Sequence, residues 1–135
     1  MAVRLEIDSG VAWITLDRPE VLNAIDRDTR TQLRDAYVRV AEDTGIRVAV
    51  ITGAGDRAFS AGVDLKDGGD PTTSIATEEF GGRSRHLLSG FPSDKPTIAA
   101  INGYALGGGL EIALRTDMVV DGDARAQRAD GGRHV

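Results

Sequence analysis

The 135-residue sequence predicts an α/β domain, because short apolar runs typical of strands alternate with segments of helical periodicity. Four runs have the length and composition of strands, and they occupy residues 3–7, 11–16, 47–52 and 98–101. An amphipathic stretch separates the second run from the third, and a triple glycine opens a further helix after the fourth. The chain is long enough to form one hydrophobic core.

The first two runs predict a β-hairpin. Apolar and charged residues alternate over residues 3–8, which is the period of a half-buried strand. Ser9-Gly10 has the composition of a turn, and residues 11–16 form the second strand. Pro19 cannot donate a hydrogen bond to a sheet, so we expect the chain to leave the sheet there.

A helix follows the hairpin, with Asp26 or Asp28 as its N-terminal cap. Its apolar residues recur every three or four positions and form a single stripe, made of Leu33, Ala36, Tyr37, Val40 and Ala41. Gly45 is expected to end this helix. The run at 47–52 is then a buried strand, and the helical crossover before it predicts parallel pairing with the second strand.

The glycine-containing segment after this strand, Gly53–Ala58, has two interpretations. It matches the relaxed dinucleotide-binding pattern G-x-G-x-x-A after a strand. A dinucleotide site also needs a helix at this point and an acidic residue at a strand end about twenty positions later, and the sequence predicts neither. A turn that uses glycine for positive φ values explains the segment better.

The stretch at 98–120 is the one around which the chain is organised. Before it, residues 64–71 have the composition of a loop and residues 75–90 are interpreted as a helix. Within it, Gly107–Gly109 follows a buried strand and opens a helix that carries Glu111 in its first turn. Bare N–H groups at the positive end of a helix dipole favour negative charge, so the stretch predicts an anion site beside an acid/base group.

Composition excludes several classes of function. The net charge of −5 and the lack of a basic cluster argue against a nucleic-acid-binding protein. There are no cysteines, which excludes disulfides, thiolate metal sites and a cysteine nucleophile, and we expect no metal site. The first residues contain no long apolar run, so we expect no signal peptide, no membrane span and a cytoplasmic location.

Two stretches resemble the signature segments of the crotonase superfamily, the enoyl-CoA hydratase/isomerase family: RAFSAGVDLK at 57–66 and INGYALGGGLEIALRTDMVV at 101–120. LDRPEVLNAID at 16–26 and RVAVITGAG at 47–55 resemble the same family. The resemblance implies a crotonase-like spiral of ββα units, usually assembled as trimers or pairs of trimers. It also implies an acyl-CoA thioester as the partner, with coenzyme A carried by the substrate and no separate cofactor.

The shared chemistry of this family is stabilisation of the enolate of an acyl-CoA thioester. By resemblance, Val63 and Gly108 supply the two backbone N–H donors of an oxyanion hole, which is a strong catalytic device. Glu111 matches the family glutamate that holds and helps to deprotonate the added water. The resemblance also predicts which residues contact the substrate: Ala61, Val63, Asp64, Leu65, Lys66 and Gly108, a set that includes both donors.

Each of these residues also has a structural interpretation. For Val63 it is core packing, and for Gly108 it is a helix start that lies close to a strand. For Glu111 it is favourable interaction with the helix dipole, worth about 0.3–1 kcal/mol. For Asp64 and Lys66 it is a solvated loop.

The C-terminal part departs from the family pattern. Hydratases of this family carry a second glutamate after the strand that follows the signature helix, and no Glu follows Glu111 here. Residues 121–135 contain no Leu, Ile, Phe or Met, so we expect a disordered tail outside a family domain that spans residues 1–120. The predicted spiral is therefore truncated after the signature helix and its following strand and lacks much of the trimer interface, and a frameshift would explain the tail.

Three functions remain open. The first is hydration of a 2-enoyl-CoA, although isomerases and hydrolases share the same donor pair. The second is a non-catalytic acyl-CoA-binding fragment, which the missing second carboxylate favours. The third is a nucleotide-binding module, which rests on Gly53–Ala58 alone. A spiral that ends midway also exposes a sheet edge and an apolar face, so we expect the isolated chain to associate.

Overall fold

The computed structural model describes residues 1–64 and 94–121. The interpreted helix at 75–90, Leu65, Lys66 and the tail from residue 122 lie outside the described residues. In chain order the elements are β1 (Val3–Asp8), β2 (Val11–Leu16), the short 3-10 helix η1 (Pro19–Val21), α1 (Arg27–Glu42), β3 (Val48–Gly53), β4 (Ala58–Ser60), β5 (Thr97–Ile101), β6 (Tyr104–Ala105), α3 (Gly108–Leu114) and β7 (Met118–Asp121). The predicted α/β class is confirmed.

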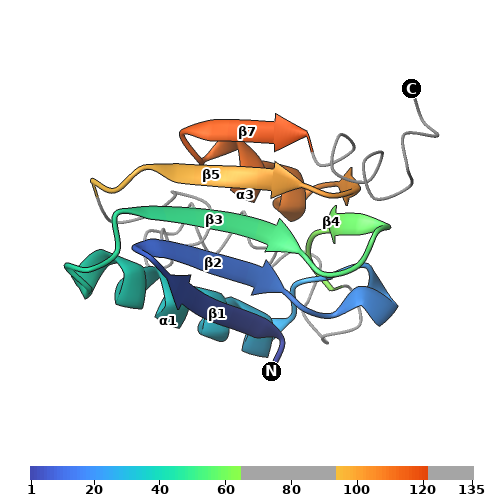
Figure 1. Cartoon of the computed structure of the whole chain (residues 1–135). Helices are drawn as coiled ribbons and strands as arrows, with labels where there is room; N and C mark the ends of the chain where they lie inside the picture. The colour runs from blue at the N-terminus through green and yellow to red at the C-terminus, as the bar shows by residue number, and fades with distance from the viewer. Residues whose placement is uncertain (65–93, 122–135) are drawn as a thin grey trace, which may run out of the picture.

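The larger sheet has the strand order β1-β2-β3-β5-β7. β1 and β2 are antiparallel, which confirms the predicted hairpin, and the other neighbouring strands are parallel. The predicted pairing of the third strand with the second is also confirmed, with Ile14 opposite Ile51. The parallel strands all point the same way (Figure 1), so the loops that follow them meet at one edge of the sheet.

Helix α1 packs its apolar stripe against the sheet, with Leu33 and Val40 completely buried. Of the two candidate caps, Asp26 is the N-cap, and its carboxylate accepts hydrogen bonds from the backbone N–H and hydroxyl of Thr29. The predicted end at Gly45 was wrong, because the helix ends at Glu42. The ammonium group of Lys95 binds the carbonyl oxygens of Val40 and Asp43 there, so a distant side chain caps this end.

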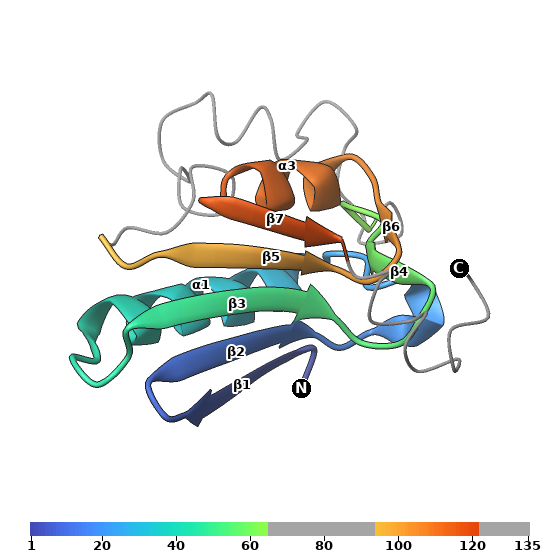
Figure 2. The same cartoon turned by 45° about the horizontal axis from the view of Figure 1, so that its top comes forward.

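The second sheet joins two very short strands, β4 and β6, in parallel. The sequence analysis missed both, because three and two residues are too few to show a period. β5, β6 and α3 form one ββα unit, whose first strand lies in the larger sheet and whose second lies in the smaller. β3 and β4 divide between the sheets in the same way, so the chain advances as the predicted spiral (Figure 2).

The core lies between the larger sheet and the helices, and among its completely buried side chains are Ile14, Leu33, Ile51 and Phe59. β7 ends the described sheet on the side opposite β1, and its residues Met118, Val119 and Val120 are 57%, 50% and 45% exposed. Leu110 and Leu114 of α3 are exposed as well. Neither α-helix in the described part of the chain is both long and apolar enough to cross a membrane.

We predict that Asp26→Ala lowers the free energy of unfolding by about 1 kcal/mol, because it removes the N-cap of α1. Asp26→Asn is the matched comparison, since Asn caps a helix about as well as Asp and loses only the negative charge facing Arg18. Urea unfolding at pH 7 measures both. Equal losses in the two variants would show that the charge, and not the cap, stabilises this helix.

The same cap predicts a pH dependence. Burial raises the pKa of Asp26, but the hydrogen bonds from Thr29 and the charge of Arg18 outweigh it, so the pKa lies below its ordinary value of 3.8. A depressed folded pKa means that the stabilisation is present above pH 3.8 and is lost as the pH falls through the folded value. Urea unfolding from pH 5 downward should show a smaller loss for Asp26→Asn, which cannot titrate at this position.

Candidate active site

The first signature segment runs beside the residues that precede α1. Three backbone hydrogen bonds join the two segments: Ala61 N to Leu22 O at 2.9 Å, Ile25 N to Gly62 O at 2.7 Å and Asp64 N to Ile25 O at 2.9 Å. A trans peptide is planar, so its N–H points away from its C=O. Because Ile25 binds the carbonyl oxygen of Gly62, the N–H of Val63 points away from the Leu22–Ile25 segment.

Helix α3 starts against the end of β4. Gly107 precedes it with a φ of 52°, a left-handed value that glycine adopts without strain. Leu106 N donates to the carbonyl oxygen of Ser60 at 3.0 Å. A Cβ on Gly109 would lie 2.3 Å from the same oxygen, which is too close for any side chain. The helix can therefore begin here only because residue 109 is glycine.

This packing brings the two predicted donors side by side. A Cβ on Gly108 would lie 3.9 Å from the backbone nitrogen of Val63, and a Cβ on Gly62 would lie 3.0 Å from the nitrogen of Gly108. No residue within 1–64 or 94–121 accepts a hydrogen bond from either N–H. Both residues are only partly buried, so water or another external acceptor can reach their N–H groups.

The structure agrees with the structural interpretations of Val63 and Gly108. The side chain of Val63 packs against the core, while its N–H has no acceptor within residues 1–64 and 94–121. Gly108 opens a helix that lies against a strand, as expected for that alternative. Ala61 uses its N–H to bind Leu22 O, so within the described structure it positions the segment. Core packing and a binding role for the backbone are therefore compatible.

Glu111 lies in the first turn of α3, and its side chain is exposed. Its backbone N–H donates to Gly107 O at 3.1 Å. Residues three apart share one face of a helix, and side chains lean toward the helix N-terminus, so Glu111 belongs to the face of Gly108. In the described ranges no cluster of three or more His, Cys, Asp or Glu side chains could hold a metal ion.

Asp64 continues from Val63, but its carboxylate faces inward. Its Oδ2 atom lies 3.2 Å from Nη1 of Arg18, and the Asp64 side chain is 15% exposed. The family resemblance placed Asp64 along the substrate, and no sequence pattern indicated its ion pair with Arg18. The other two residues predicted along the substrate, Leu65 and Lys66, lie outside the described part of the chain.

Two buried asparagines hold the loops around this site, and sequence reasoning missed both. Nδ2 of Asn23 and Nδ2 of Asn102 donate to the carbonyl oxygen of Ala58, at 2.9 Å and 3.0 Å. Their Oδ1 atoms accept from the backbone N–H groups of Arg18 and Gly53, at 2.8 Å and 3.0 Å. Asn23 has a φ of 54°, and the tolerance of Asn for such values was the available signal.

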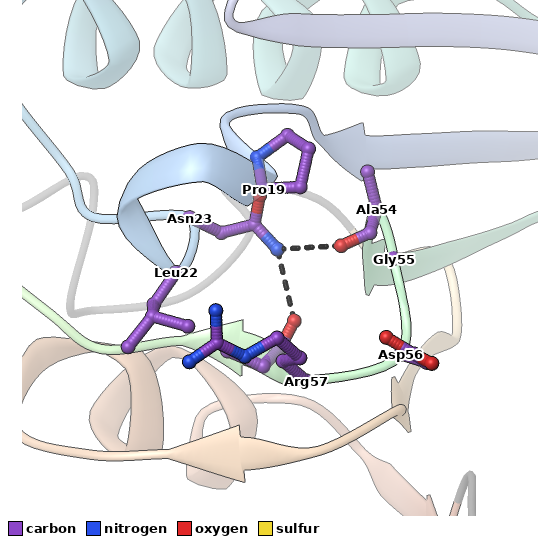
Figure 3. A pocket seen from close by; sticks show the side chains of 8 residues that line it. Pro19, Leu22, Asn23, Ala54, Gly55, Asp56 and Arg57 are labelled. Atoms are coloured by element: carbon purple, nitrogen blue, oxygen red, sulfur yellow. Dashed lines mark hydrogen bonds between the residues drawn. The ribbon is translucent and has the colours of Figure 1, made fainter.

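The segment Gly53–Ala58 is a turn, as the structural interpretation predicted. Gly55 has a φ of 87°, and the chain continues into strand β4, where a dinucleotide site would require a helix. The turn and the Pro19–Asn23 segment line a pocket of about 50 Å³ (Figure 3). Ligand pockets usually have roughly 300–1,000 Å³, so this one is too small for a nucleotide.

We predict that Gly109→Ala destabilises the protein by about 1–3 kcal/mol, because the added Cβ meets the backbone of Ser60. Gly108→Ala is the matched control. Its Cβ would lie 3.8 Å from Gly62 Cα, which is ordinary contact, so its stability should stay close to that of the wild type. Urea unfolding of both variants tests this, and equal stabilities would contradict the close approach.

Comparison with known proteins relates the chain to proteins of known family. The sequence model described as "Enoyl-CoA hydratase/isomerase" matches residues 6–129. The (E)-benzylidenesuccinyl-CoA hydratase of Thauera aromatica is 45% identical over 118 residues, which are 87% of this chain and 46% of that protein. The carnitinyl-CoA dehydratase of Proteus mirabilis is 43% identical over 125 residues, covering 90% of this chain and 46% of the relative.

The fold agrees as well. The crystal structure of carnitinyl-CoA hydratase from Mycobacterium avium has a TM-score of 0.73 and 42% identity, covering 87% of this chain and 45% of that one. The chain spans about half the length of the curated relatives it matches. A family match over most of the chain, together with a shared fold at this identity, shows that the chain belongs to the enoyl-CoA hydratase/isomerase family of the crotonase superfamily.

Proposed function

We propose that the chain binds an acyl-CoA thioester and stabilises its enolate with the backbone N–H groups of Val63 and Gly108. The proposed reaction is the addition of water to a 2-enoyl-CoA, with Glu111 as the acid/base group. One observation carries the proposal: two backbone donors lie side by side at the start of α3, and no described residue accepts a hydrogen bond from them.

Enolate formation gathers negative charge on the thioester oxygen. When water adds to the double bond of a 2-enoyl thioester, an electron pair moves toward this carbonyl. Donors that are already held in place stabilise the developing charge without reorganising, and the loss of one typically costs about 3–4 kcal/mol. The bond from Ile25 N to Gly62 O and the start of α3 hold the two N–H groups before any substrate binds.

Hydration also needs a group that accepts a proton from the added water. A positioned acid/base group typically contributes about 10²–10⁴-fold to the rate. Glu111 supports this role because it is exposed and shares the helix face of Gly108. Two relatives carry names that describe the addition or removal of water, benzylidenesuccinyl-CoA hydratase and carnitinyl-CoA dehydratase, and this favours hydration over isomerisation and hydrolysis.

We predict that the protein consumes a short 2-enoyl-CoA, and that Glu111→Gln slows the reaction about 10²-fold or more. The assay follows the absorbance of the conjugated enoyl thioester. Glu42→Gln is the matched control, because Glu42 is an exposed glutamate at the end of α1. It should react at the wild-type rate, and equal rates for all three proteins would contradict the assigned role.

The alternative functions give different outcomes with the same samples. Binding of an acyl-CoA without turnover by the wild type would identify a non-catalytic acyl-CoA-binding protein. Binding of NAD without affinity for coenzyme A would favour the nucleotide-binding function that rests on Gly53–Ala58. Turnover of the 2-enoyl-CoA to a double-bond isomer, without addition of water, would assign the chain to the isomerases of the family.

We predict that Gly108→Pro lowers kcat about 10²–10³-fold, because proline has no N–H to donate. Residue 108 is the first of the helix, where proline is well tolerated, so the fold should persist. Gly108→Ala keeps the N–H and should retain more activity than the proline variant. Circular dichroism checks that each variant is folded, and equal activity of the folded proline and alanine variants would contradict the donor role.

A further inference from the structure

The guanidinium group of Arg18 joins two segments that are far apart in the sequence, the residues just before α1 and the first signature segment at Asp64. Its Nη1 atom donates to Ala24 O at 2.6 Å and lies 3.2 Å from Oδ2 of Asp64. Its Nη2 atom lies 3.4 Å from Oδ2 of Asp26, the N-cap of α1. The Arg18 side chain is 20% exposed, so these contacts are largely shielded from water. Shielded ion pairs are screened by salt less than pairs on the surface.

These contacts involve residues next to the peptide that carries the N–H of Val63 and next to Ile25, which binds that peptide. The carbonyl side of that peptide is held by Ile25 N, and the next residue, Asp64, is held by its own backbone bond to Ile25 O. Arg18 adds a side-chain tie from Asp64 to the residues just before α1. The direction of the Val63 N–H therefore depends on the register between residues 22–25 and residues 61–64.

We propose that Arg18 is a positioning residue, which holds the Val63 N–H in its direction by binding Asp64 and Ala24. The catalytic part of this inference rests on the proposed function. Without Arg18, the carboxylates of Asp26 and Asp64 would lose the cation that contacts both of them, and the attraction that holds the two segments together would weaken. A displacement of about 1 Å at a reacting group can cost roughly 10²-fold in rate.

The test uses the full chain with Arg18→Gln, Arg18→Lys and Asp64→Asn. Arg39→Gln is the matched control, because Arg39 pairs with Asp43 on an exposed surface, with 60% of its side chain accessible. The first readout is the NMR signal of the Val63 amide, together with the hydrogen exchange rates of the Ile25 and Asp64 amides, which are hydrogen-bonded. We expect Arg18→Gln to shift the Val63 signal and to speed exchange at Ile25 and Asp64, while amides in β2 and β3, and all three of these amides in Arg39→Gln, stay unchanged.

The second readout is turnover of a 2-enoyl-CoA. Arg18→Gln should lower kcat about 10–100-fold with little change in KM, since the donor acts on the developing enolate. Asp64→Asn should also lower kcat. The double variant with Arg18→Gln should lose less than the sum of the two single effects on the activation free energy, because both substitutions break the same contact. Arg18→Lys keeps a charge near Asp64 but lacks the planar fork that reaches three acceptors, so its kcat should lie between those of the wild type and Arg18→Gln.

The outcomes separate this inference from the proposed function. If the wild type shows no turnover, the proposed reaction fails, and the Val63 amide alone decides whether Arg18 positions it. An unchanged Val63 amide in folded Arg18→Gln overturns the inference, whatever the activity. If Arg18→Gln does not fold, Arg18→Lys and Asp64→Asn replace it with the same two readouts, and an unchanged Val63 amide in both also overturns the inference.

Discussion

The carbonyl oxygen of Ala58 binds two buried side-chain amides, and the loops at this edge of the sheet depend on that contact. Asn23 reaches it from the segment after β2, and Asn102 reaches it from the end of β5. The same two amide groups also donate to Ala54 O and Gly55 O within the turn after β3. A buried polar group without a partner costs about 1–3 kcal/mol, so only an arrangement that satisfies every member of the network is stable.

Other features of the site follow from this network. It fixes the turn that leads into β4, and β4 presents the backbone of Ser60 to the start of α3. A glycine at residue 109 then allows the helix to begin in contact with that backbone, which places Gly108 beside Gly62 and Val63. The two N–H groups, which have no acceptor in the described part of the chain, are thus adjacent because the backbones approach so closely.

Backbone groups and side chains have different roles in the proposed site. The proposed donors are peptide groups, so the side chain of Val63 can pack against the core while its N–H has no acceptor among the described residues. Two carboxylates carry negative charge near the site, and their surroundings differ. Glu111 is exposed on the helix, whereas Asp64 is mostly buried and pairs with Arg18. In the proposed reaction, Asp64 helps to position a donor, and Glu111 has the exposure that proton transfer with water requires.

Local patterns in the sequence determined the elements that are long enough to show a period. The hairpin, α1 with a cap at Asp26 or Asp28, the strand β3 and the glycine-opened helix α3 all follow from neighbouring residues. The order of the signature segments also determined the family. These features could be predicted because each depends on residues close together in the chain or on a motif that can be recognised in the sequence.

Only the tertiary structure decided the remaining features, because each rests on contacts between residues that are distant in the sequence. Strands β4 and β6 exist through mutual pairing, and Lys95, not Gly45, caps the end of α1. The partner of Asp64 is 46 residues away, and those of Asn102 lie 44 to 49 residues away. The sequence by itself named two possible donors, and packing of the backbone placed them side by side.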